Sequence, residues 1–227
     1  MNIRNKLKIT LKSKKIFFPI LLIGNWLSQS IFSMDKTEKI ARLSIEIILI
    51  VILFIIFLFL TPLHILLSLV IAFLIANTLS WFMFSNAHLY IIASLEIATI
   101  EKKSLKIYIE GLKKRGNRNQ AILCIAIFGS MSRGEFHEYS DLDARVIRKK
   151  GFKNGILAVG FIIKERWKAQ KNRIPLEILL GDSTSFMKKM RKDEPPVIIY
   201  DPNNEIISNF KKSLTLKEAL KLNKIME

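Results

Sequence analysis

The stretch FGSMSRGEFHEYSDLDARVI, residues 128–147, joins a glycine–serine turn to two closely spaced carboxylates. Gly129 and Ser130 follow one apolar run, and Asp141 and Asp143 begin the next. Side chains alternate between the faces of a strand, so Asp141 and Asp143 are expected to point the same way. Two ionised carboxylates held that close repel each other unless a cation lies between them, and hard oxygen ligands favour Mg²⁺ or Mn²⁺ over zinc. The stretch therefore predicts a divalent metal site where a strand begins.

The turn before the carboxylates has the features of a phosphate-binding loop. Gly129 lets the backbone approach a phosphate closely, Ser130 adds a hydroxyl group, and backbone N–H groups at such a turn form a cradle for anions. The spacing is not that of a Walker A loop. A plain turn and a solvated strand end are the alternatives. The joint presence of the turn and the carboxylates favours a functional site.

Apolar runs and helical periods around the motif predict a mixed α/β domain. The expected strands are residues 121–128, 142–147, 174–180 and 196–200. The expected helices are residues 95–112 with a stop at Gly116, 153–169, 183–191, and a basic helix from Thr215. Cys124 lies in the first strand, where a lone buried thiol fits a reducing compartment, and no Cys/His cluster offers a zinc site.

A long uncharged stretch, Ile47–Leu95, predicts two membrane spans. A helix needs about 20 apolar residues to cross the bilayer core, and Thr61-Pro62 divides the stretch into spans near Leu43–Leu60 and Leu63–Phe84. Uniform apolarity without a polar stripe argues against a buried helical pair in a soluble protein. Both flanks are basic, +7 over residues 1–42 and +12 over residues 97–227. The positive-inside rule therefore predicts a hairpin with both ends in the cytoplasm.

The chain is thus expected to have three regions: a basic N-terminal segment on the membrane surface (1–42), a two-span hairpin (43–84) and a cytoplasmic domain (85–227). Lys12–Lys15 and the apolar run that follows are similar to the start of a signal peptide, but no small-residue cleavage site follows. Whether residues 16–34 enter the membrane stays open. Aromatic residues are expected at the membrane interface: Trp81, Phe82, Phe84 and Tyr90. His64 and His88 are interpreted as interfacial, and His137 as a surface residue.

Two motifs resemble the signature of the DNA polymerase β-like nucleotidyltransferase superfamily: Gly129-Ser130-x-x-Arg133-Gly134-Glu135 and Ser140-Asp141-Leu142-Asp143. The resemblance covers about residues 98–205 and is closest to the small, minimal domains of the superfamily. It implies transfer of a nucleoside monophosphate from a nucleoside triphosphate, ATP among the candidates, to a hydroxyl or similar acceptor. It also implies a mixed α+β sheet flanked by helices, in which Gly129 and Ser130 hold the triphosphate and Asp141 and Asp143 hold two metal ions, Mg²⁺ or Mn²⁺. Arg133 is a candidate for binding the nucleotide, and a structural role as a cap of the loop is the alternative.

The resemblance further implies a third carboxylate on a neighbouring strand, and Glu177 is the position that fits. It is expected to bind the second metal ion and to act as base toward the acceptor hydroxyl; a surface charge on an edge strand is the alternative. Arg145 departs from the pattern, because an apolar residue is more usual two positions after Asp143. It could pair with Asp143, contact a substrate phosphate, or mark a diverged site.

These features together predict a membrane-anchored nucleotidyltransferase. Its expected partners are a nucleoside triphosphate, membrane lipid, a lipid-linked, protein or small-molecule acceptor, and a partner subunit of the kind that minimal family members often need. One alternative is a nucleotide-sensing or regulatory membrane protein of the same fold without turnover. Another is a basic membrane protein that binds nucleic acid. The basic run at residues 188–192 favours a solvated or lipid-facing patch, so nucleic acid is not expected as a partner.

Overall fold

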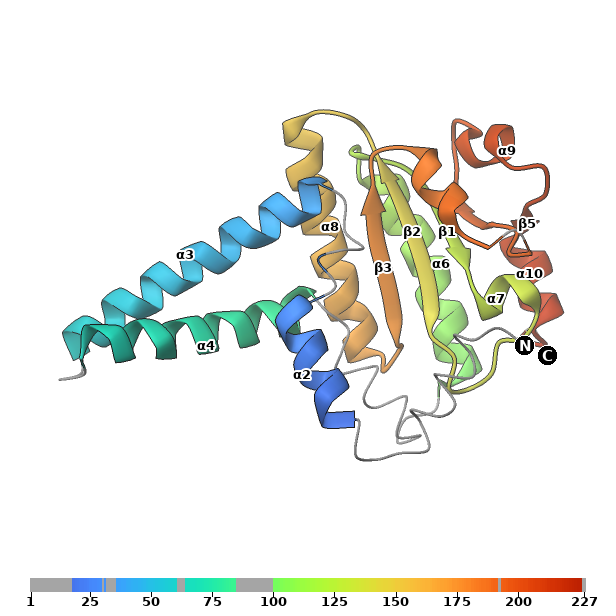
Figure 1. Ribbon diagram of the computed structural model, residues 1–227. Coiled ribbons are helices and arrows are strands. Elements are labelled where there is room, and N and C mark those ends of the chain that lie inside the picture. Colours follow the sequence, from blue (N-terminus) through green and yellow to red (C-terminus); the bar gives the residue numbers. More distant parts are fainter. Residues whose placement is uncertain are drawn as a thin grey trace.

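The computed structural model describes residues 18–29, 31, 36–60, 64–84, 100–191 and 193–225. Figure 1 shows a sheet domain from which two long helices project. The helices are α2 (Phe18–Ser28), α3 (Lys36–Leu60), α4 (Ile65–Phe84), α6 (Lys102–Arg118), α7 (Ser130–Arg133), α8 (Phe152–Lys171), the 3-10 helix η3 (Thr184–Lys189), α9 (Glu205–Asn209) and α10 (Leu216–Leu222). The strands are β1 (Ile122–Phe128), β2 (Leu142–Arg148), β3 (Leu176–Gly181), β4 (Val197–Tyr200) and β5 (Leu214–Thr215).

The five strands form one mixed sheet in the order β3-β2-β1-β4-β5. β1 lies antiparallel to β2 and β4, whereas β2 pairs with β3 and β4 with β5 in parallel. The continuous apolar run ILCIAIF suits the central strand β1, because both faces of that strand are covered. The predicted mixed α/β fold is therefore confirmed. The sequence did not predict α9 or β5, and residues 183–191 form a 3-10 helix instead of an α-helix.

Helices cover the two faces of the sheet unequally. One face packs against α6, α8 and α10, and alternate residues such as Ile125, Val146 and Ile178 fill this main core. The other face carries a smaller cluster in which Phe128 and Cys124 contact residues of η3 and α9. Burial raises the pKa of Cys124 to about 12, with nearby carboxylates adding to the effect. The prediction of a buried thiol is therefore confirmed.

The predicted stop of α6 at Gly116 is wrong, because the helix continues through it to Arg118. A Cβ atom at position 116 would lie 2.6 Å from Ile125 Cδ1, on the central strand. Glycine is therefore used here to bring the helix close to the sheet. Residues 95–99 of the same predicted helix lie outside the described residues.

Helices α3 and α4 pack on each other, and both are long and apolar enough to cross a membrane. Large apolar side chains are exposed along both, for example Ile52 at 50% and Leu66 at 65%. At the sheet-domain end, Trp81 and Phe84 are buried in protein contacts, whereas Phe82 is 49% exposed. Several predicted features lie outside the described residues: the turn at residues 61–63, His88, Tyr90, and residues 1–17 of the N-terminal segment.

The first turns of α3 are anchored on the sheet domain. Glu38 is buried. Its carboxylate accepts a hydrogen bond from Arg166 Nη2 at 2.9 Å and another from the backbone N–H of Leu180 at 3.4 Å. Arg166 also donates to the carbonyl oxygen of Ile178. The boundary predicted between residues 42 and 43 thus falls inside one continuous helix that begins on β3 and α8.

Candidate active site

The phosphate loop predicted from the sequence is a tight turn between β1 and the single-turn helix α7. Gly129 has φ 70° and ψ −145°, a backbone conformation that glycine adopts readily and that is unfavourable for residues with a Cβ atom. A Cβ atom there would overlap the Oδ2 atom of Asp143. The backbone N–H and the hydroxyl of Ser132 both donate to the Gly129 carbonyl oxygen, at 3.1 and 3.0 Å. Gly129 therefore brings the turn directly against one of the predicted metal ligands.

Ser130, the first residue of α7, has a buried side-chain oxygen without a hydrogen-bond partner among the described residues. Buried hydroxyl groups are rarely left unpaired in folded proteins. An anion held in the turn would satisfy this hydroxyl together with the N–H groups at the start of α7. The Ser130 hydroxyl is thus placed to donate a hydrogen bond to an anion bound in the turn.

The three predicted carboxylates come together at one end of the sheet. Asp143 and Glu177 are neighbours in the parallel register of β2 and β3, and Asp141 precedes β2. One carboxylate oxygen from each lies within 4.8 Å of the others. All three residues are partly buried. A cluster of three carboxylate oxygens at this spacing fits a hard divalent cation.

The electrostatics of Asp143 show how crowded this cluster is. Burial raises the pKa of Asp143 from the ordinary value of about 3.9 to about 7, and the charges of Asp141 and Glu177 act in the same direction. The positive charge of Arg145 opposes the shift. A divalent cation between the carboxylates would remove the repulsion and favour the ionised form.

Arg145 is a buried cation that forms an ion pair with Glu177. Its Nη2 atom donates to Glu177 Oε1 at 2.9 Å and lies 3.9 Å from Asp143 Oδ1. The sequence left three roles open for Arg145. In the structure Arg145 pairs with the carboxylates, and Glu177 is a closer partner than Asp143.

Arg133 is engaged by two carboxylates in this structure. Nε donates to Glu135 Oε2 at 2.7 Å, and Nη1 forms a short ion pair with Glu194. Glu194 is buried and belongs to the segment between η3 and β4. Arg133 therefore ties the phosphate loop to that segment. These two bonds use two of the five N–H donors of its guanidinium, so a contact with nucleotide does not require the loss of either carboxylate.

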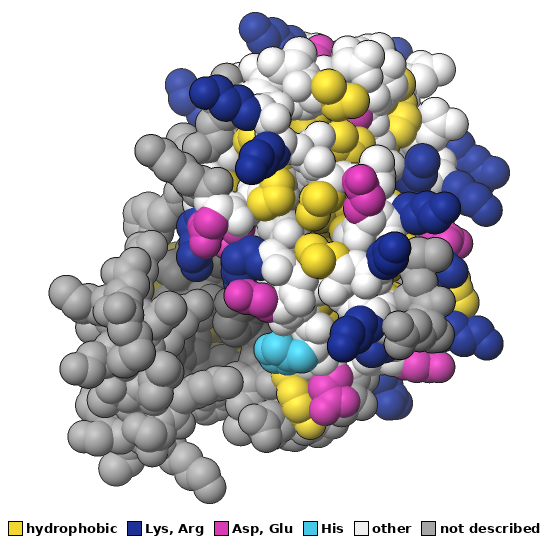
Figure 2. Space-filling view, turned by 90° about the vertical axis from the view of Figure 1, so that its right-hand side faces the viewer, with side chains coloured by type: hydrophobic (Ala, Val, Ile, Leu, Met, Phe, Trp, Pro, Cys, Tyr) yellow, Lys and Arg dark blue, Asp and Glu magenta, His cyan; other side chains and the backbone are white. Residues whose placement is uncertain are grey.

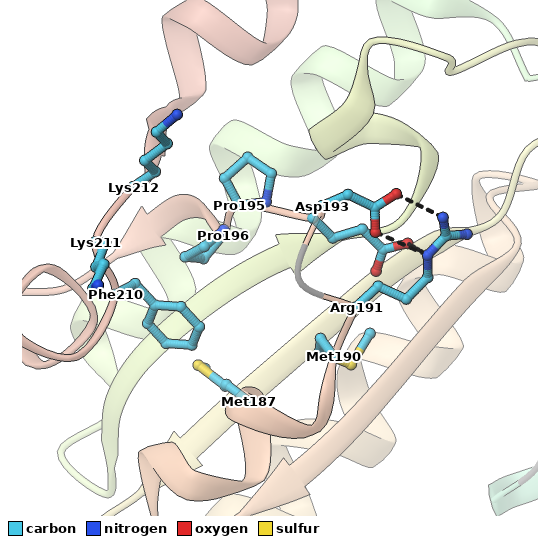
Figure 3. Close-up of a pocket in the computed structure, with 10 residues that line it drawn as sticks. Met187, Met190, Arg191, Asp193, Pro195, Pro196, Phe210, Lys211 and Lys212 are labelled. Carbon is cyan, nitrogen blue, oxygen red and sulfur yellow. Dashed lines mark hydrogen bonds and ion pairs between the residues drawn. The ribbon is translucent and has the colours of Figure 1, made fainter.

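A cleft of about 660 Å³ lies beside this ion pair, with Glu194 in its wall. Met187, Met190 and Phe210 supply apolar surface (Figure 3). The Phe210 ring lies 6.3 Å from the ring of Phe128, the residue before the phosphate loop. Figure 3 shows Arg191 paired with Asp193 at one end and Lys211 and Lys212 at the other. The cleft thus combines an apolar floor with cationic groups on the same face of the sheet as Asp143.

The C-terminal helix also supports the phosphate loop, through a residue that the sequence analysis missed. Asn223 is buried; its Nδ2 donates to the Met131 carbonyl oxygen at 2.8 Å and its Oδ1 accepts from the Phe136 N–H at 2.9 Å. Gly134, with φ 74°, lies against Leu222. No local sequence pattern marks Asn223, because its partners lie about 90 residues earlier in the chain.

The surface around α9 and α10 carries many Lys and Arg side chains, interspersed with apolar patches (Figure 2). His137 is exposed, as expected for a surface residue. Of the basic run at residues 188–192, the side chains of Lys188, Lys189 and Lys192 lie outside the described part of the chain.

Comparison with known families gives one match. A family model described as a nucleotidyltransferase domain matches residues 105–222, 118 of the 227 residues. Comparisons with curated proteins and with solved structures give no match. The matched residues run from α6 to the end of α10 and include the turn at Gly129, the three carboxylates and most of the predicted range. The resemblance to nucleotidyltransferases is confirmed at this level, and the chain belongs to the nucleotidyltransferase domain family.

Proposed function

We propose that this protein is a membrane-anchored nucleotidyltransferase that transfers a nucleoside monophosphate from a nucleoside triphosphate to an acceptor hydroxyl, with Mg²⁺ or Mn²⁺. One observation carries the proposal. The carboxylates of Asp141, Asp143 and Glu177 cluster within 4.8 Å beside a glycine turn whose buried Ser130 hydroxyl has no partner among the described residues.

The acidic cluster would hold the divalent ion. When bound, such an ion polarises the reacting phosphorus and offsets negative charge that develops on the leaving pyrophosphate. The N–H groups at the start of α7 and the Ser130 hydroxyl bind the phosphates that leave. Arg133 adds positive charge on the same side, through N–H donors that its bonds to Glu135 and Glu194 do not use.

Glu177 acts as the base. Its carboxylate accepts the proton of the acceptor hydroxyl while that oxygen forms a bond to the α-phosphorus. The bond between the α-phosphorus and the oxygen that bridges to the β-phosphate breaks, and pyrophosphate leaves toward Ser130. The products are the nucleotidylated acceptor and pyrophosphate. The neighbouring cleft, with Phe210 and Lys211 among its lining residues, suits a ligand that has both a planar apolar part and anionic groups, as a nucleotide does.

The membrane part of the proposal rests on α3 and α4. Apart from their contacts with each other, with α2 and with the sheet domain, the apolar side chains of these helices are exposed along most of their length. Exposed apolar surface of this extent requires a bilayer or a partner, and the basic flanks favour a hairpin with both ends in the cytoplasm. An anchor of this kind favours an acceptor at the membrane, such as a lipid-linked intermediate or a membrane protein.

The test is transfer of label from an α-labelled nucleoside triphosphate in the presence of Mg²⁺ or Mn²⁺. The full chain in lipid nanodiscs is compared with Asp141→Asn/Asp143→Asn, and Asp182→Asn, an exposed carboxylate outside the cluster, is the control. Wild type and control should transfer label and the double variant should not. Equal incorporation by wild type and double variant would remove the enzyme from the proposal. Recovery of the chain in the aqueous phase without detergent would remove the anchor.

A second candidate function is a nucleotide-binding regulatory membrane protein without turnover. The observation in its favour is the pairing of Glu177, the proposed base, with Arg145 at 2.9 Å. Nucleotide binding that depends on Ser130 but gives no transfer with any triphosphate would select this function.

A further inference from the structure

Arg145 is a buried cation placed among the carboxylates of the candidate active site. It follows Asp143 by two residues on β2, so the two side chains lie on the same face of the sheet. The residue is only 6% exposed. Its Nη2 atom donates to Glu177 and lies 3.9 Å from Asp143. The guanidinium therefore occupies the region that an ion shared by Asp143 and Glu177 would need.

Backbone contacts hold the guanidinium in this place. Nη1 donates to the carbonyl oxygens of Ala144 and Glu177, at 3.0 and 3.5 Å. Arginine remains protonated throughout the ordinary pH range. Withdrawal of a buried guanidinium from its partners is unfavourable, because both it and the carboxylate would lose their compensating charge. Arg145 is therefore a fixed part of the charge of the site.

The charges of the site balance with one divalent ion. Asp141, Asp143 and Glu177 contribute three negative charges when ionised, and Arg145 contributes one positive charge. The remaining two negative charges match one dication. A second dication would lie next to the guanidinium, and like charges at that distance repel strongly in a partly buried site.

We propose that Arg145 replaces one of two divalent ions, so that this chain binds a single ion through Asp141 and Asp143 while Arg145 holds Glu177. The inference rests on the proposed function, because it concerns the metal requirement of the same site. The guanidinium then supplies positive charge beside the acceptor hydroxyl. Glu177 Oε1 is engaged by Arg145, and the second oxygen of Glu177 is left to accept the hydroxyl proton.

The test counts Mn²⁺ ions bound to the full chain in detergent, without nucleotide, from the loss of the free Mn²⁺ signal in electron paramagnetic resonance. Wild type should bind one ion per chain at saturation. Arg145→Met, which keeps an unbranched side chain but removes the guanidinium and its charge, should bind two. The second ion should be lost again in Arg145→Met/Glu177→Gln, because Glu177 would be its ligand.

The matched control is Arg148→Met. Arg148 is also a buried arginine of β2, but it is three residues further along and so on the opposite face, where it donates to the Lys149 carbonyl oxygen and to Thr37. This variant should still bind one ion. Arg145→Lys keeps a cation at the site and should also bind one.

Two ions bound to wild type, or one ion bound to both wild type and Arg145→Met, would overturn the inference. If Arg145→Met fails to fold, Arg145→Gln takes its place with the same expected counts, and two ions in wild type overturn the inference without either variant. Wild type that binds no Mn²⁺ overturns the inference together with the metal part of the proposed function. One ion in wild type and two in Arg145→Met without any nucleotide transfer supports the inference and rejects the enzyme. Nucleotide transfer by a wild-type chain that binds two ions supports the enzyme and rejects the inference about Arg145.

Discussion

Without divalent ions, Asp143→Asn is expected to make the folded protein more stable at neutral pH. Burial raises the pKa of Asp143 to about 7, and the charges of Asp141 and Glu177 add to this shift. At neutral pH the fold therefore holds a carboxylate in surroundings that disfavour its ionised form. Asparagine keeps the shape of the side chain but carries no charge, so this unfavourable contribution disappears.

The size of the effect follows from the pKa shift. About three pKa units, at 1.36 kcal/mol each, correspond to about 4 kcal/mol. Because the folded pKa lies above the unfolded value, the folded state binds the proton more tightly, and the contribution of Asp143 to stability falls as the pH rises from about 4 to about 7. The advantage of Asp143→Asn over wild type should be about 1.5 kcal/mol at pH 5 and about 4 kcal/mol at pH 8.

The assay is equilibrium urea denaturation of both proteins in the same detergent with EDTA, at pH 5 and pH 8. Asp182→Asn, at an exposed position, is the control and should match wild type at both values. Mn²⁺ should remove the advantage of Asp143→Asn at pH 8, because a cation among the carboxylates stabilises the ionised form. A free-energy difference between variant and wild type that is the same at pH 5 and pH 8 would refute the reasoning.

Two further substitutions test the turn and the anchor. Gly129→Ala places a methyl group against Asp143 Oδ2 at a φ of 70°. It should abolish nucleotide transfer and lower the free energy of unfolding by about 1–3 kcal/mol. The control Gly160→Ala, in α8 with open space around the new Cβ atom, should keep activity and raise the free energy of unfolding by up to about 1 kcal/mol. Glu38→Gln leaves the buried Arg166 without its charge partner and should lower the free energy of unfolding by about 3–5 kcal/mol. The control Glu110→Gln, at an exposed position, should change it little. Equal denaturation midpoints for these two variants would contradict the anchoring role of Glu38.

Local sequence patterns were sufficient for strands β1 to β4 and for the proximity of Asp141 to Asp143. β1 and β3 are apolar runs bounded by turn residues, and the alternation of side chains along a strand needs no tertiary information. The juxtaposition of Asp143 and Glu177 is different, because it depends on the parallel pairing of β2 with β3 across α8. The family resemblance, not the periodicity, indicated Glu177.

Contacts between distant segments account for what the sequence did not reveal. Gly116 in a basic helix end has the local signature of a stop, yet the side chain of Ile125 on the sheet explains the glycine. The pair of Arg133 with Glu194 joins residues 61 positions apart, and that of Glu38 with Arg166 joins residues 128 positions apart. Periodicity predicts which face of an element a side chain occupies but not which partner it contacts there. The ion pairs between distant residues could therefore not be predicted from the sequence.

The position of β3 connects the site to the anchor. β3 is one of the two edge strands of the sheet, and the paired helices α3 and α4 leave the domain on this side (Figure 1). Glu177 and Leu180 both belong to β3, and the N–H of Leu180 donates to Glu38 of α3. The strand that carries the proposed base is therefore the one to which the apolar helix is fixed, while the phosphate loop lies two strands away at the end of β1. An acceptor that approaches Glu177 from this edge of the sheet comes from the side of α3 and α4, so if these helices cross a membrane as proposed, it approaches from the membrane side.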